Sequence, residues 1–148
     1  MDTGDHFDAS ANNALVRAVE DAKSRGHDEV HPVHLFRGVV GSGGETLCTI
    51  YRSAGTNPQE MLDNLEKIFP PKQGPAPTAL PTFAEWTKQV LLRSQSYSDR
   101  RGRNKVSAED LFLTLVSDTE MERVLRLLGI DAKSLSVQAK ENLGLAPQ

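Results

Sequence analysis

The two halves of this chain repeat one another, and this duplication constrains the fold more than any other feature of the sequence. Phe7 and Phe83 open the two copies at an offset of 76 residues, since 83 − 7 = 76. The same offset pairs Leu15 with Leu91, Arg25 with Arg101, Gly26 with Gly102, Val30 with Val106, Leu35 with Leu111, Phe36 with Phe112 and Val40 with Val116. After a loop that is two residues shorter, an offset of 74 pairs Ile50 with Val124, Gly55 with Gly129, Met61 with Leu135 and Phe69 with Leu143. Glycines and apolar positions that recur in one register indicate a tandem duplication.

A proline-rich segment separates the two copies. Five prolines and a glycine fall within residues 70–81. Proline fixes φ and removes a backbone donor, so neither a helix nor a central strand is expected there. We therefore predict a single domain over 1–148, with a first repeat at about 7–69, a linker at 70–81 and a second repeat at about 82–144.

Apolar residues recur at helical spacing in both copies, which predicts four helices in each. In the first copy we expect helices at 8–24 and 32–41, a third that closes at Ala54-Gly55, and a fourth that starts near Pro58. In the second copy we expect a helix at 82–99, a second starting at Ser107, a third that closes at Leu128-Gly129, and a fourth starting near Asp131. No useful run of alternating residues predicts a strand, so the fold class is all-α.

Several residues predict where these helices begin and end. Ser10 or Asn12 is expected to cap the first helix, and Gly26 to end it in the left-handed conformation. Pro32 occupies a favoured first helical position, whereas Ser107 and Asp110 form a capping-box pattern at the matching place in the second copy. The apolar face of the first helix is expected to hold Leu15, Val16, Val19 and Ala22.

The composition places the chain among globular proteins. Apolar residues make up 38% and charged residues 25%, and the formal net charge of −3 predicts no general attraction for nucleic acid or acidic membranes. Cys48 is the single cysteine, which excludes an intrachain disulfide and is typical of a buried thiol in a reducing cytosol. The first residues show no signal-peptide pattern, and no apolar run is long enough to span a bilayer. We expect a cytoplasmic location.

The repeated motifs resemble those of a known family. The first copy carries Arg25-Gly26-His27, then Val30-His31-Pro32-Val33-His34-Leu35; the second carries Arg101-Gly102, then Val106-Ser107-Ala108-Glu109-Asp110-Leu111. Over about residues 7–144 the chain is similar to the N-terminal domain of Clp-type AAA+ unfoldases, the ClpA, ClpB and ClpC group. The resemblance implies two four-helix repeats related by pseudo-twofold symmetry, and a domain that receives protein substrates or adaptor proteins ahead of Clp ATPase modules.

No motif in this chain predicts catalysis. The phosphate-binding pattern G-x-x-x-x-G-K-[ST] does not occur, and the glycine-rich stretch at 41–45 lacks its lysine. We therefore expect no enzyme activity and no cofactor in this chain, with ATP bound only by ATPase modules elsewhere. His27, His31 and His34 have spacings that can share a metal, with His6 upstream, but Pro32 interrupts the helical face. We expect no metal, with His34 packed or hydrogen-bonded between helices and the others facing solvent.

The resemblance also indicates a binding groove. Phe7 and Phe83 at the start of the repeats are expected either to anchor the core or to line an apolar groove beside the symmetry axis, together with Leu15 and Leu80. ClpC-type domains that capture phosphoarginine carry an acidic residue just inside the second helix of each repeat. Glu109 fills this place in the second copy, but Val33 occupies it in the first, so at most half of such a site is expected.

One charged turn is a second candidate contact. Arg100, Arg101, Arg103 and Lys105 form a basic turn, which we interpret as a solvated loop or an adaptor contact; no aromatic residues are interleaved as nucleic-acid binding would require.

The sequence thus favours a non-catalytic domain that binds unfolded or tagged proteins or adaptors, and that is a monomer when isolated. Alternatives are a free-standing accessory subunit of a Clp protease assembly, or a structural oligomerisation module. ATPase modules following Gln148 would favour the binding domain of a longer protein over the free-standing accessory subunit.

Overall fold

A computed structural model describes residues 7–42, 44–68, 81–127 and 129–144. The first repeat contains α1 (Ala9–Ser24), β1 (Glu29–Val30), α2 (Pro32–Ser42), α3 (Glu45–Ser53) and α4 (Pro58–Ile68). The second contains β2 (Thr82–Phe83), α5 (Glu85–Arg100), α6 (Ala108–Ser117), α7 (Thr119–Leu127) and α8 (Ala132–Asn142). The predicted four helices per repeat are confirmed. Phe69, Leu128 and nearly all of the predicted linker lie outside the described residues. No helix of the described ranges is long and apolar enough to cross a membrane.

The helix starts agree with the sequence in one repeat more closely than in the other. Ser107 and Asp110 form the predicted capping box at the start of α6. At α1 the predicted caps are wrong, because the Asp8 carboxylate accepts the Ala11 N–H at 3.0 Å and is the residue that caps the helix. Ser10 already lies in the first turn and donates its hydroxyl to Asp8 at 2.7 Å. Asp8 caps the helix because it stands directly before the first helical residue, whereas Ser10 is already inside the first turn.

Two short backbone pairings, not expected from the sequence, join the repeats across the symmetry axis. Val30 of β1 pairs in parallel with Phe83 of β2, and Phe7 pairs in parallel with Val106. The Ala84 N–H donates to the Val30 carbonyl at 3.1 Å, and the Asp8 N–H donates to the Val106 carbonyl at 2.9 Å. Each pair is the other shifted by the offset of 76 residues, so the opening segment of each repeat is held by the opposite repeat. This exchange is the pseudo-twofold symmetry that the family resemblance implies.

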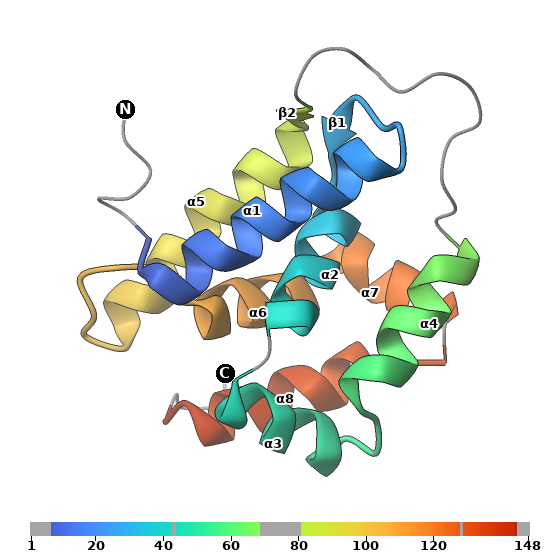
Figure 1. Ribbon diagram of the computed structural model, residues 1–148. Helices are drawn as coiled ribbons and strands as arrows, with labels where there is room; N and C mark the ends of the chain where they lie inside the picture. The colour runs from blue at the N-terminus through green and yellow to red at the C-terminus, as the bar shows by residue number, and fades with distance from the viewer. Residues whose placement is uncertain (1–6, 43, 69–80, 128, 145–148) are drawn as a thin grey trace.

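The helices stack in layers about this axis (Figure 1). The pair α1 and α5 forms one outer layer, α2 and α6 lie beneath it, and the third and fourth helices of each repeat cover the far side. Phe36 and Phe112, which are equivalent residues, stack at the centre with 6.1 Å between ring centroids, and Tyr51 meets Phe112 edge-on at 5.4 Å. Cys48 is half-buried on α3 and not fully buried as predicted. The two repeats therefore share one hydrophobic core.

Candidate functional site

The described surface has an apolar groove between α1 and α5. Its volume is about 420 Å³, and it runs beside the pseudo-twofold axis. Its lining is Phe7, Asn12, Leu15, Val16, Val19, Glu20, Lys23, Phe83 and Leu91. We call this feature the α1–α5 groove. Three of the four residues predicted from the resemblance, Phe7, Leu15 and Phe83, lie in it, whereas Leu80 lies outside the described residues.

The lining residues differ in how far they reach into solvent. Phe7 and Leu15 are 8% and 7% exposed, so they belong to the core and offer only an edge to the groove. Phe83 and Leu91 are half-buried, and Val16 is 55% exposed. The two predicted roles for the phenylalanines thus divide between them: Phe7 mainly anchors the core, and Phe83 presents more of its ring to the groove.

The exchanged backbone pairs hold both phenylalanines in place. Phe83 is fixed by β1, because Val30 accepts both the Ala84 N–H and the Thr87 hydroxyl, the latter at 2.6 Å. Phe7 is fixed by its bridge to Val106. The groove floor is therefore a property of the assembled pair of repeats, and neither repeat supplies it alone.

The rim of the groove is polar and its two sides are not equivalent. Asn12, Glu20 and Lys23 line the α1 side. Val19 extends the apolar floor along α1, but its counterpart on α5 at the offset of 76 is Gln95. The apolar surface therefore continues farther along α1 than along α5, which gives the groove a direction despite the symmetry of the fold.

Val16 lies on the predicted apolar face of α1, but the rest of the fold leaves it exposed. The spacing of Leu15, Val16 and Val19 fits one helix face, but only Leu15 of the three is buried. Its counterpart on α5, Leu92, is also exposed, at 68%. The sequence shows that both positions are apolar, but only the structure shows that both are exposed, which is typical of a binding surface.

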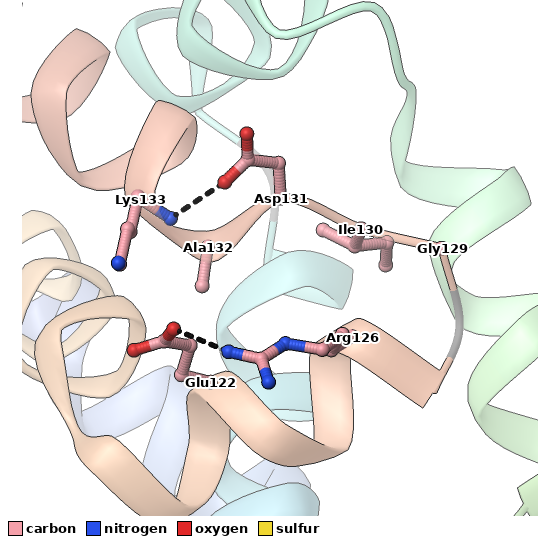
Figure 2. Close-up of a pocket in the computed structure, with 7 residues that line it drawn as sticks. All are labelled: Glu122, Arg126, Gly129, Ile130, Asp131, Ala132 and Lys133. Carbon is pink, nitrogen blue, oxygen red and sulfur yellow. Dashed lines mark hydrogen bonds and ion pairs between the residues drawn. The ribbon is translucent and has the colours of Figure 1, made fainter.

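A second hollow lies between α7 and α8 and has a different chemistry (Figure 2). Its volume is about 350 Å³, and Figure 2 shows that its polar groups bond to one another. Arg126 pairs with Glu122 at 2.9 Å, and the Lys133 N–H donates to the Asp131 side chain at 3.1 Å in the cap of α8. Because these contacts shape the α7–α8 turn itself, we place the functional site in the α1–α5 groove.

The predicted basic turn is divided by the structure. Arg101 is largely buried and pairs with Asp110 at 2.9 Å, while its guanidinium also donates to Ser107 at 3.2 Å. Arg103 is exposed and pairs with Asp8 at 3.1 Å, and the exposed Arg100 lies over the Tyr97 ring. Arg101 therefore serves the α6 capping box, which leaves Arg100, Arg103 and Lys105 as the exposed cations of this turn. An adaptor contact there stays a prediction.

The candidate phosphoarginine position carries an acidic residue in the second repeat only. Glu109 is half-buried in the first turn of α6. Val33, the equivalent residue of α2, is only 7% exposed and carries no charge. A contact through Glu109 alone stays a prediction.

The histidines form a hydrogen-bonded cluster at the start of α2. The His31 N–H donates to Nδ1 of His34 at 2.8 Å, and Nε2 of His34 lies 2.9 Å from Nδ1 of His27. His34 is fully buried, as expected, but His27 and His31 are half-buried and do not simply face solvent. Burial lowers the pKa of His34 to about 4, although the Asp21 charge opposes this shift. Within the described ranges no three such side chains are arranged to hold a metal ion, and His6 lies outside them.

The sequence of this chain is similar to sequences of a known family over most of its length. A sequence profile for the Clp repeat (R) N-terminal domain matches residues 6–128. The chloroplastic chaperone protein ClpC of Pisum sativum is 28% identical over 142 residues, which cover 95% of this chain but 15% of that protein. This chain therefore spans less than a fifth of that relative's length.

Solved structures share the fold. The Hsp104 N-terminal domain from Candida albicans superposes with a TM-score of 0.80 at 19% identity, over 95% of this chain and 93% of that one. A ClpV N-domain in complex with a VipB peptide superposes with a TM-score of 0.68 at 16% identity, over 93% and 87% of the two chains.

Proposed function

Because this chain belongs to the Clp repeat (R) N-terminal domain family, we propose that it is a non-catalytic domain that receives protein segments for a Clp-type ATP-dependent chaperone or protease. Its ligands are unfolded or tagged substrates, or an adaptor protein. The observation that carries this proposal is the α1–α5 groove, with Val16 exposed at its edge and Phe83 held in its floor by the opposite repeat.

The chemistry of the groove suits an extended apolar segment. Burying apolar surface is worth about 25 cal/mol per Å², so a ligand that covers Val16, Phe83 and Leu91 is stabilised without specific hydrogen bonds. A volume of about 420 Å³ falls within the roughly 300–1,000 Å³ range of ligand pockets. The side chains of an unfolded segment fit such a groove, whereas in a folded protein the same side chains are buried.

The rim favours reversible binding. Glu20 and Lys23 carry opposite charges, so the groove has no strong preference for the charge of its ligand. A ligand with a small contact area and no deeply buried side chain binds weakly. Weak binding shows mainly as a fast dissociation rate, because differences in affinity lie mostly in that rate. Such a site can pass its ligand to a neighbouring module.

One neighbour supports this reading. The ClpV N-domain was solved with a peptide of VipB, so a domain of this fold can hold a peptide. At 16% identity that likeness concerns the fold, and we carry peptide binding to this chain as part of the proposal.

A chemical-shift titration tests the proposal. The ¹⁵N-labelled chain is titrated with reduced, carboxymethylated α-lactalbumin, which cannot fold, and with native α-lactalbumin as the control. We expect the amides of Val16, Val19, Phe83 and Leu91 to shift with the unfolded form only. Shifts confined to α7 and α8, or none with any unfolded protein, would refute binding in this groove.

A further inference from the structure

The end of α1, β1 and the start of α2 meet in a compact polar cluster. We call it the histidine corner: His27, His31 and His34, with Asp21 of α1 and its C-cap residue Arg25 beside them. His34 is fully buried there, while the other two histidines are half-buried. His34 is therefore the ring of this corner whose protonation the fold resists most directly, because it is the one that is fully buried.

The hydrogen bonds determine which nitrogen of the His34 and His27 rings carries a proton. Nδ1 of His34 accepts the His31 N–H at 2.8 Å, so in the neutral ring the proton is on Nε2. That Nε2 lies 2.9 Å from Nδ1 of His27, which must then act as the acceptor. Both acceptors are Nδ1 atoms, and each is already occupied by a donor.

A further proton on the His34 ring therefore breaks a hydrogen bond. On Nδ1 of His34 that proton faces the His31 N–H, which until then donates to this nitrogen at 2.8 Å. Two donors then point at one another, which is unfavourable in a buried site. The hydrogen bonds of the corner are satisfied only when the His34 ring is neutral.

The fixed charges around the corner are already balanced. Arg25 pairs with Asp21 at 2.8 Å and also with Glu66 of α4, and Arg37 of α2 lies 3.2 Å from Asp21 and 3.3 Å from Glu66. These four residues carry two positive and two negative charges. Burial is therefore the main obstacle to an imidazolium at His34, and the Asp21 charge, which favours the imidazolium, offsets it only in part.

The corner is linked to the α1–α5 groove through the backbone. His31 directly follows Val30, whose carbonyl accepts the Ala84 N–H at 3.1 Å and the Thr87 hydroxyl at 2.6 Å. The pairing of Val30 with Phe83 places the Phe83 ring in the groove. Loosening the segment before α2 therefore loosens Phe83.

The second repeat has the same geometry without the histidines. At the offset of 76, Arg103, Ser107 and Asp110 stand where the first repeat has His27, His31 and His34. The Asp110 carboxylate accepts the Ser107 N–H at 2.9 Å and pairs with Arg101. None of these groups ordinarily titrates between pH 5 and 7. The bridge of Phe7 to Val106 is thus the internal control for the bridge of Phe83 to Val30.

We propose that the histidine corner is a proton-operated switch, in which proton uptake at mildly acidic pH opens the turn at residues 27–31 and releases Phe83 from β1, while the equivalent bridge of Phe7 to Val106 stays closed. The consequence for the ligand, which is weaker binding in the α1–α5 groove, rests on the proposed function. The opening of the turn is independent of the proposed function.

The change in the opening equilibrium with pH follows from the difference between the pKa of His34 in the closed corner and its pKa in the open form. Burial lowers the pKa of His34 to about 4, and an opened turn returns the ring toward its ordinary value near 6.5. The open form therefore binds the proton that the closed form excludes. Linkage then raises the opening equilibrium constant about tenfold between pH 7.5 and pH 5.5.

Amide hydrogen exchange on the whole chain tests the switch with two matched reporters. The Ala84 amide reports the Val30 bridge, and the Asp8 amide reports the Val106 bridge. After correction for the intrinsic exchange rate, we expect the protection factor of Ala84 to fall about tenfold between pH 7.5 and 5.5, and that of Asp8 to stay constant. Equal changes at both amides overturn the proposal.

Two variants locate the proton. In H34N the Asn oxygen can still accept the His31 N–H but cannot titrate. The protection factor of the Ala84 amide should therefore no longer fall between pH 7.5 and 5.5. In H27N the acceptor for His34 is likewise kept and His34 still titrates, so the fall should persist. If H34N does not fold, the ¹⁵N spectrum of the wild-type imidazoles decides, since a His34 ring with a proton on Nδ1 at pH 7 overturns the proposal.

A binding measurement separates the two proposals. The probe is a short rhodamine-labelled peptide of alternating leucine and serine, which does not titrate in this range. Affinity that falls between pH 7.5 and 5.5 in the wild type but not in H34N supports the coupling to the groove, and equal pH dependence in both rejects it. Absence of binding at pH 7.5 counts against the proposed function, while the exchange data still decide the switch.

Discussion

The backbone N–H of His31 donates to Nδ1 of His34 at 2.8 Å, and in the other repeat the N–H of Ser107 donates to the Asp110 carboxylate at 2.9 Å. The two pairs occupy equivalent positions at the offset of 76. One helix start thus uses an imidazole and the other a carboxylate for the same backbone contact. The imidazole makes the first repeat sensitive to acid, because a buried imidazole must stay neutral.

Acid should therefore destabilise the whole domain through His34. Its pKa in the fold, about 4, lies below the ordinary value near 6.5, so the unfolded chain binds more protons between these values. Stability from this residue is complete above about pH 6.5 and is lost as the pH falls toward 4. We expect the free energy of unfolding to drop by about 2 kcal/mol from pH 7.5 to pH 5. Urea denaturation followed by the fluorescence of Trp86 measures it, and a wild-type slope retained in H34N would contradict the assignment to His34.

Gly38 allows α1 and α2 to approach closely, and its replacement should be costly. A Cβ at this position would overlap the Ala14 carbonyl oxygen, which belongs to backbone and cannot rotate away. We expect G38A to lower the free energy of unfolding by about 1–3 kcal/mol, as overpacked cores do. Gly41 in the same helix is the control, since the nearest atom to its Cβ is a side-chain nitrogen of Arg17 at 3.7 Å. G41A should be neutral or slightly stabilising, because alanine favours the helix. Thermal denaturation of both variants distinguishes these outcomes.

The sequence predicted the helices well because both copies repeat the same periodicity and the same turn glycines. Gly26 and Gly102, for example, have φ values of 74° and 71°, which explains their place after the first helix of each copy. The α1–α5 groove was predicted only in part. A helix face at Leu15, Val16 and Val19 does not say which of its residues the rest of the fold covers, and that depends on how α5 is placed.

The exchanged bridges and the role of Arg101 could not be predicted at all. Both depend on contacts between segments far apart in the sequence, such as Phe7 with Val106, and two-residue strands leave no alternating pattern. Arg101 has the sequence context of a surface turn, with Arg100 and Arg103 as neighbours. Only the fold places Asp110 beside it.

The ion pair of Arg101 gives a prediction about stability. Its partner Asp110 is fully buried, so removing the arginine leaves a buried carboxylate without its counter-charge. We expect R101Q to lower the free energy of unfolding by about 2 kcal/mol, less than a fully buried pair because Arg101 keeps some contact with solvent. R100Q removes the same charge from the exposed neighbouring position and should change stability by less than about 0.5 kcal/mol. Equal effects in urea denaturation would show that Arg101 has no structural role.

The α1–α5 groove can be tested by placing a charge at its edge. Val16 is 55% exposed and lines the groove, so V16E should leave the fold intact while putting a carboxylate where the ligand buries apolar surface. An unpaired charge there costs more than 1.4 kcal/mol, which lowers the affinity for carboxymethylated α-lactalbumin by about tenfold or more. Val137 on α8 provides a closely matched control, because it is also a valine on a helix surface and is 53% exposed, but it does not line the groove. V137E adds the same charge and should bind like the wild type. If V137E loses as much affinity as V16E, the added net charge explains the weaker binding. The α1–α5 groove is then not the binding site.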